Sequence, residues 1–87
     1  MADLVVKVTG SITATKTHSS HGGIFGGDGT DTWRPPKGKK LTEANFKLIS
    51  TDDADAYLDT STSTAAKVKW WVNPFGKVKY RITLKYK

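Results

Sequence analysis

The side chains most capable of chemistry are two histidines and a set of aspartates, and their spacing decides whether they can form a site. His18 and His21 could share a transition metal if a turn brought them together, with Asp28 or Asp31 as the third ligand. No local pattern fixes the separation of the two imidazoles, which general acid–base catalysis would require.

Two other segments match calcium sites only in part. Residues 26–33 fit the repeat of a calcium-binding β-roll, but that roll shares each ion between tandem copies, and the sequence holds a single copy. The acidic run 52–59 (DDADAYLD) lacks the glycine and the final glutamate of the helix–loop–helix calcium loop. Motifs that cradle phosphate or expose a nucleophilic serine are absent from the sequence. The sequence therefore predicts no catalytic residue, no metal site and no cofactor.

Positive charge is concentrated at the C-terminal end. The chain has 14 Lys and Arg against 8 Asp and Glu, a net charge of +6. Residues 66–87 hold seven of the bases and none of the acids, so the preceding residues are slightly acidic overall. Because 12 of the bases are Lys and bidentate reading of bases favours Arg, this excess indicates non-specific contact with a polyanion, nucleic acid foremost.

The segment Asn73-Pro74-Phe75-Gly76 predicts that the basic C-terminal residues fold into a β-hairpin. Proline presets φ at the second turn position, and glycine accepts the left-handed conformation that ends a three-residue hairpin loop. The resulting register places Trp70 opposite Tyr80 on an apolar face. The other face then pairs Lys69 with Arg81.

The outer face of this hairpin is the predicted binding site, because its bases surround one indole. Its residues are Lys67, Lys69, Trp71, Lys77, Lys79, Arg81 and Lys85. Repulsion between directly opposed cations turns into attraction when an anion binds, and an indole can stack on a nucleic-acid base or a sugar ring. The first functional prediction is therefore a non-catalytic module that binds polyanions. The alternatives for this face are a subunit interface and a plain solvated surface.

Alternation of apolar and polar residues predicts further strands. Residues 4–8 and 12–17 follow the two-residue period, either as one strand bent at Gly10 or as a hairpin around it. Residues 30–33 form a short strand. Residues 41–50 fit a strand or a capped helix, and the strand is favoured from 44 onward. Residues 52–59 are predicted as an acidic turn, with one or two helical turns as the alternative.

The middle of the chain, residues 19–40, is predicted to be a loop segment rich in glycine and proline. Five glycines fall between residues 19 and 29, and Pro35 and Pro36 exclude a central strand. Ile24 and Phe25 stand between pairs of glycines in this segment. We predict that these two apolar side chains tuck under the sheet or contact a partner.

These patterns together predict an all-β chain, with residues 1–87 forming a single domain. The fold class is a small antiparallel sheet, arranged as a sandwich or open barrel of about five or six strands, with a C-terminal β-hairpin. With 37% hydrophobic residues and no cysteine for a disulfide, the core must be thin. A thin core with unpaired strand edges favours a homo-oligomer.

Two alternative functions follow from the same features. One is a structural subunit of a virion-like or surface assembly. The other is a carbohydrate-binding module that uses Trp33, Trp70 or Trp71 as a sugar platform. Light scattering with and without a random oligonucleotide would separate assembly from nucleic-acid binding, and sugar binding would be nearly independent of salt. The sequence shows no signal peptide and no membrane span, which indicates a cytoplasmic or virion protein rather than a secreted one.

Overall fold

The computed structural model describes residues 10–20 and 25–87, which form one antiparallel sheet. Its strands are β1 (Gly10–Ser19), β2 (Gly27–Trp33), β3 (Leu41–Ser61) and β4 (Ala66–Tyr86). β4 is central: it pairs with β3 along one side, and with β1 and then β2 along the other. The predicted all-β antiparallel fold is therefore confirmed.

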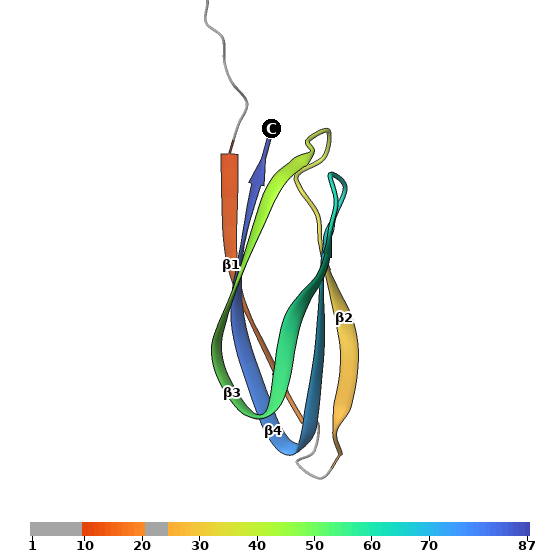
Figure 1. The fold of residues 1–87 in the computed structure, drawn as a ribbon, viewed down its shortest axis with the longest axis vertical. Helices are drawn as coiled ribbons and strands as arrows, with labels where there is room; N and C mark the ends of the chain where they lie inside the picture. Colours follow the sequence, from red (N-terminus) through yellow and green to blue (C-terminus); the bar gives the residue numbers. More distant parts are fainter. Residues whose placement is uncertain (1–9, 21–24) are drawn as a thin grey trace, which may run out of the picture.

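Both long strands bend in the middle, so the sheet folds back on itself (Figure 1). We call the two layers the β1 half, with residues 41–52 of β3 and 77–86 of β4, and the β2 half, with residues 54–61 and 66–72. Side chains from the two layers contact each other across the interior. The rings of His18 in the β1 half and Trp70 in the β2 half stack with centroids 3.8 Å apart.

The core lies between the two layers and follows from the alternation along β4. Even-numbered side chains of this strand point inward, and odd-numbered ones point to solvent. The largest fully buried side chains of the fold are those of Tyr80, Ile82, Val68 and Val78. Alanines of β3, at positions 54 and 56, complete the interior opposite them.

The bend is built from irregularities that face each other on β3 and β4. Asp53 and Phe75 both adopt the left-handed conformation, with φ of 53° and 64°. The Asn73 side-chain amide donates a 2.8 Å hydrogen bond to the Asp53 carboxylate, which ties the two strands together at this point. At Gly76, a Cβ atom would collide with the backbone carbonyl oxygens of Asp53 and Asn73. The bend therefore depends on a glycine at position 76.

The predicted hairpin around Asn73–Gly76 is wrong. β4 continues through these residues and keeps β3 as its neighbour, instead of turning back to pair with itself. Trp70 and Tyr80 do share the inner face, but they lie in opposite layers rather than on adjacent strands. The turn residues specify a change of direction. Whether that change makes a hairpin depends on the available partner, and β3 supplies one that follows β4 through the bend.

Other sequence predictions are confirmed or corrected by the strand bounds. Residues 12–17 and 44–50 are strands, as expected, and the helical alternative for residues 41–50 is wrong. Residues 52–59 belong to β3 and form neither a helix nor a separate turn. β2 occupies part of the predicted loop segment 19–40. The described ranges contain four strands rather than five or six, and the strand predicted over residues 4–8 lies outside them.

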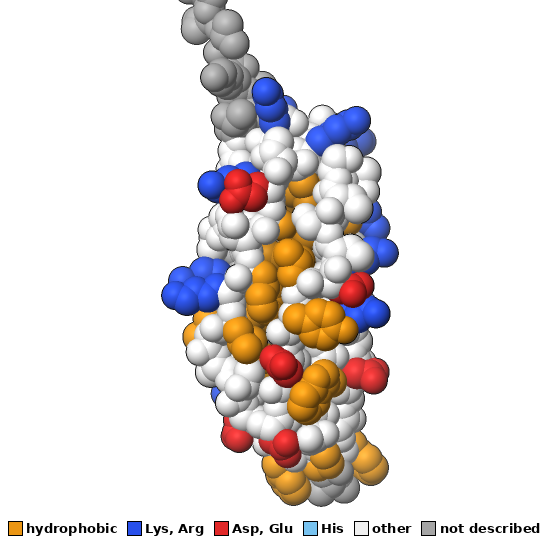
Figure 2. Space-filling view, in the orientation of Figure 1, with side chains coloured by type: hydrophobic (Ala, Val, Ile, Leu, Met, Phe, Trp, Pro, Cys, Tyr) orange, Lys and Arg blue, Asp and Glu red, His pale blue; other side chains and the backbone are white. Residues whose placement is uncertain are grey.

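The sheet does not close, because the outer edge of β3 has no partner strand within the described ranges. Four register shifts interrupt this edge, and such bulges are a common protection against edge-to-edge pairing. Hydrophobic side chains gather along the middle of the face seen in Figure 2, and Leu48 and Ile49 of β3 are each 39% exposed. Homo-oligomer formation stays a prediction.

The described part of the chain contains no helix that could cross a membrane.

Candidate functional site

The outer surface of the β1 half carries a row of cationic side chains from β4, with one more from β3. Alternation turns the odd-numbered residues of β4 outward, and Lys47 of β3 joins them because it pairs directly with Arg81. Threonines of β1 flank the row on its other side, with Thr15 opposite Arg81 and Thr17 opposite Lys79. We call this surface the cationic face; its basic residues are Lys47, Lys77, Lys79, Arg81 and Lys85.

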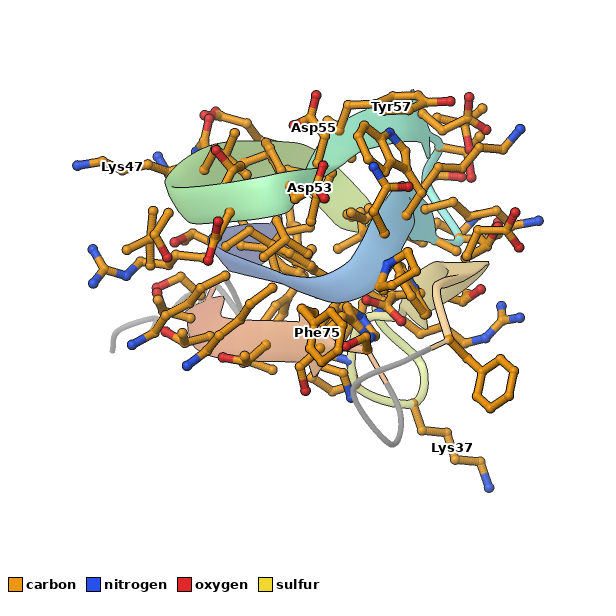
Figure 3. The ribbon with its side chains drawn as sticks, turned by 90° about the horizontal axis from the view of Figure 1, so that it is seen from below. Lys37, Lys47, Asp53, Asp55, Tyr57 and Phe75 are labelled. Atoms are coloured by element: carbon orange, nitrogen blue, oxygen red, sulfur yellow. The ribbon has the colours of Figure 1, made fainter. Side chains whose placement is uncertain are left out.

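Most of these cations lack a carboxylate partner. In the described ranges, the only ion pair on this face joins Lys85 and Glu43, with nitrogen and oxygen 3.8 Å apart. Lys47, Lys77, Lys79 and Arg81 form none there, although Asp52 is the cross-strand partner of Lys77. Figure 3 shows the Lys47 side chain extending away from the sheet. The pairing of Lys47 with Arg81 places like charges directly opposite each other, which destabilises an antiparallel sheet slightly.

The predicted seven-residue site is divided between the two halves. Lys67, Lys69 and Trp71 lie on the outer face of the β2 half, whereas Lys77, Lys79, Arg81 and Lys85 lie on the cationic face. The predicted pairing of Lys69 with Arg81 is therefore wrong, since Lys69 pairs with Thr30 and Tyr57. The division arises because β4 bends between the two groups, so that their outer surfaces face away from each other.

Trp71 has an acidic rather than a basic neighbourhood. It is 42% exposed and lies between Asp28 of β2 and Asp55 of β3, which are its direct cross-strand partners. The amine of Lys69, the nearest base along β4, lies 3.8 Å from the carboxylate of Asp59. The hairpin register predicted that Trp71 lies among unpaired cations, and this prediction is therefore wrong.

An open cavity of about 320 Å³ adjoins Trp71 on this face. Its walls also include Tyr57, which is 48% exposed, and Lys69. Sequence reasoning missed Tyr57 and Asp28 as neighbours of Trp71. Their approach depends on the pairing of β4 with β2 and β3, and no pattern within either segment signals that register. The only local clue was that Tyr57 has the same parity as Asp55 in a run with alternating alanines.

A polar network crosses the interior between the two layers. The Tyr80 hydroxyl donates to Oδ2 of Asp31, and Nε2 of His18 lies 2.6 Å from the same oxygen. The indole nitrogen of Trp33 donates to the Tyr80 hydroxyl over 3.0 Å. Burial, reinforced by the hydrogen bond to the Asp31 carboxylate, raises the pKa of Tyr80 well above its usual range. The hydroxyl therefore stays a neutral donor, and the network braces one layer against the other.

The network includes two of the metal ligands proposed from the sequence. His18 and Asp31, which the sequence proposed as ligands, contact each other directly, and His21 lies outside the described residues. Within the described ranges, no three His, Asp or Glu side chains gather as a metal site would require. The stacked Trp70 indole lies over Gly29, and its buried nitrogen has no hydrogen-bond partner.

The remaining predicted contact residues and sugar platforms occupy different environments. Phe25 is 67% exposed, so it does not tuck under the sheet, and Ile24 lies outside the described residues. Trp33 and Trp70 are packed against the core, which leaves little of either ring face for a sugar. Trp71 is the most exposed of the three indoles.

Comparison with known proteins adds no identity to this description. No family model matches the chain, and neither a curated protein nor a solved structure shows significant similarity to it.

Proposed function

We propose that this protein is a non-catalytic module that binds polyanions, nucleic acid foremost, through the cationic face of the β1 half. The observation that carries the proposal is the direct pairing of Lys47 with Arg81, next to Lys79, because none of these three cations forms an ion pair or has a carboxylate as its cross-strand partner in the described ranges. Lys77 continues the row, and Asp52 lies opposite it on β3 without an ion pair. Relative to the sequence-based hypothesis, the proposed surface includes Lys47 and omits Trp71.

The electrostatics of this surface favour an anionic ligand. Opposed cations cost the free sheet a few tenths of a kcal/mol by rough estimate, and a bound phosphate or sulfate group would remove that cost. Alternate residues of β4 are spaced about 6.7 Å apart along the strand, so Lys77, Lys79 and Arg81 form a regular line that can follow an extended charged backbone.

The composition of the face favours binding without sequence preference. Arg81 is its only arginine, and lysines contact phosphates as point charges rather than through a bidentate fork. Within residues 77–86 of β4, no aromatic side chain projects from this face, because Tyr80 and Tyr86 have the inward parity; the exposed ring of Phe75 lies at the bend. Base stacking therefore contributes little, and the affinity should come mainly from release of counterions, with a steep dependence on salt.

The test is fluorescence anisotropy of a labelled random single-stranded oligonucleotide, measured over a series of salt concentrations with the full chain. The triple variant K47Q/K79Q/R81Q removes the centre of the cationic face. Each phosphate that the variant no longer neutralises should lower the slope of log affinity against log salt by about 0.7, so the slope should fall by roughly two units.

A matched control separates this surface from net charge. K37Q/K67Q/K69Q makes the same change in total charge, from +6 to +3, but at positions outside the cationic face. We expect this variant to keep most of the wild-type slope. Equal losses in the two triple variants, or no salt-dependent binding by the wild-type protein, would contradict the proposal.

A further inference from the structure

The cavity beside Trp71 combines exposed aromatic rings with polar groups of both charges. Trp71 on β4 and Tyr57 on β3 stand on the same outer face, at diagonal positions of the paired strands. Side chains in that relation lie about 7–8 Å apart at their backbones, within reach of a single ring-sized ligand. Figure 3 shows Tyr57 and Asp55 projecting from the same side of β3.

The two rings are exposed although the protein has a thin core. The Trp71 and Tyr57 side chains are 42% and 48% exposed, while smaller residues such as Val68 are fully buried. Isolated exposed apolar residues are ordinary, but two aromatic rings that border one cavity are typical of a binding surface.

The polar groups at the cavity narrow the chemistry of the ligand. Asp28 at the cavity and Asp55 opposite Trp71 would repel a phosphate or sulfate. The Lys69 amine is partly balanced by the Asp59 carboxylate 3.8 Å away. Quaternary ammonium groups are bound in cages of converging aromatic ring faces, whereas this cavity is open. The lining residues include one carboxylate, Asp28, and one amine, Lys69. A neutral ligand rich in hydroxyl groups can use both as hydrogen-bond partners.

From these observations we infer that the outer face of the β2 half binds a neutral carbohydrate. The apolar face of a sugar ring stacks on the Trp71 indole, and Tyr57 contacts the adjacent ring. The Asp28 carboxylate accepts hydrogen bonds from sugar hydroxyls, and the Thr30 hydroxyl and Lys69 amine line the same cavity as donors. This inference does not depend on polyanion binding, which uses the other half of the sheet.

The test is ¹H–¹⁵N NMR of the full chain titrated with cello-, chito-, xylo- and manno-oligosaccharides at high salt. The indole signals of the three tryptophans report on three different environments, and loss of one signal in W71A assigns the relevant peak. We expect at least one sugar series to shift the Trp71 signal in a saturable manner while the signal of Trp33, which does not line the cavity, stays in place. W71A should weaken binding by about tenfold or more, and D28N by a smaller factor.

The matched control is F75A, which removes an aromatic ring that is 72% exposed at the bend, away from the cavity. It should bind the sugars as the wild type does. The inference is overturned if none of the four series shifts the Trp71 signal, or if W71A binds as tightly as F75A. It is also overturned if tetramethylammonium or an oligonucleotide shifts that signal and the sugars do not. Because high salt suppresses polyanion binding, a negative result here leaves the cationic face unaffected.

Discussion

Tyr80→Phe removes a single oxygen from the middle of the interior and should destabilise the fold strongly. The Tyr80 side chain is completely buried, and its hydroxyl donates to Asp31 while accepting from Trp33. Both partners come from β2, whereas Tyr80 lies in the β1 half, so this hydroxyl connects the two layers. Phenylalanine fills the same space, and the loss is therefore one of hydrogen bonding rather than of packing.

The expected cost can be estimated from the two bonds. A hydrogen bond to a charged acceptor contributes about 1.5–3 kcal/mol, and a buried donor left without a partner costs about 1–3 kcal/mol. In this variant Asp31 retains its contact with His18. Its side chain is 16% exposed, so water can replace part of the lost hydrogen bond from Tyr80. We therefore expect a loss of about 2–3 kcal/mol, which for a domain of this size lowers the midpoint of thermal unfolding by roughly 10–20 °C.

Urea unfolding followed by tryptophan fluorescence measures this loss, and calorimetry gives the midpoint independently. Tyr57→Phe is the matched control, because it removes the same atom from a side chain that is 48% exposed. That variant should stay within about 0.5 kcal/mol of the wild type. If Y80F were as stable as Y57F, the hydroxyl would not hold the layers together, and the proposed role of the network would be wrong.

Two further predictions concern alkaline pH and the bend. Burial and the Asp31 hydrogen bond raise the pKa of Tyr80, so the folded protein keeps this proton at pH values where an unfolded tyrosine, with a pKa of about 10, has lost it. The free energy of unfolding should therefore fall as pH rises above about 10, and urea titrations should show a shallower fall in Y80F; equal slopes would contradict this. Gly76→Ala should lower the free energy of unfolding in urea by about 3 kcal/mol or more, because the new Cβ would meet rigid backbone oxygens. Gly27→Ala should lower it far less, because no atom lies within 4 Å of the new Cβ. Similar stability of the two alanine variants would show that the bend tolerates a side chain.

The sequence predicts which side chains of a strand point inward or outward better than it predicts which strands pair with each other. The alternation of Val68, Trp70 and Val72 identifies the buried side of β4 whether or not the chain reverses after it. The turn residues from Asn73 to Gly76 carry no information about which strand lies alongside. The same limit explains residues 52–59, where a run of aspartates favours a turn, but Ala54 and Ala56 are buried against β4.

The candidate sites differ from the predicted one because the charge on a sheet face is set by cross-strand partners. Along β4 alone, Trp71 and Arg81 belong to one basic segment. In the β1 half, β3 brings Lys47 to Arg81, and its acidic residues there lie opposite lysines. In the β2 half, β3 brings Asp55 to Trp71. The bend then turns these two regions away from each other. A chain that reads as uniformly basic at its C-terminal end thus presents a cationic surface on one layer and an indole flanked by carboxylates on the other, and this separation is why we assign the two surfaces different ligands.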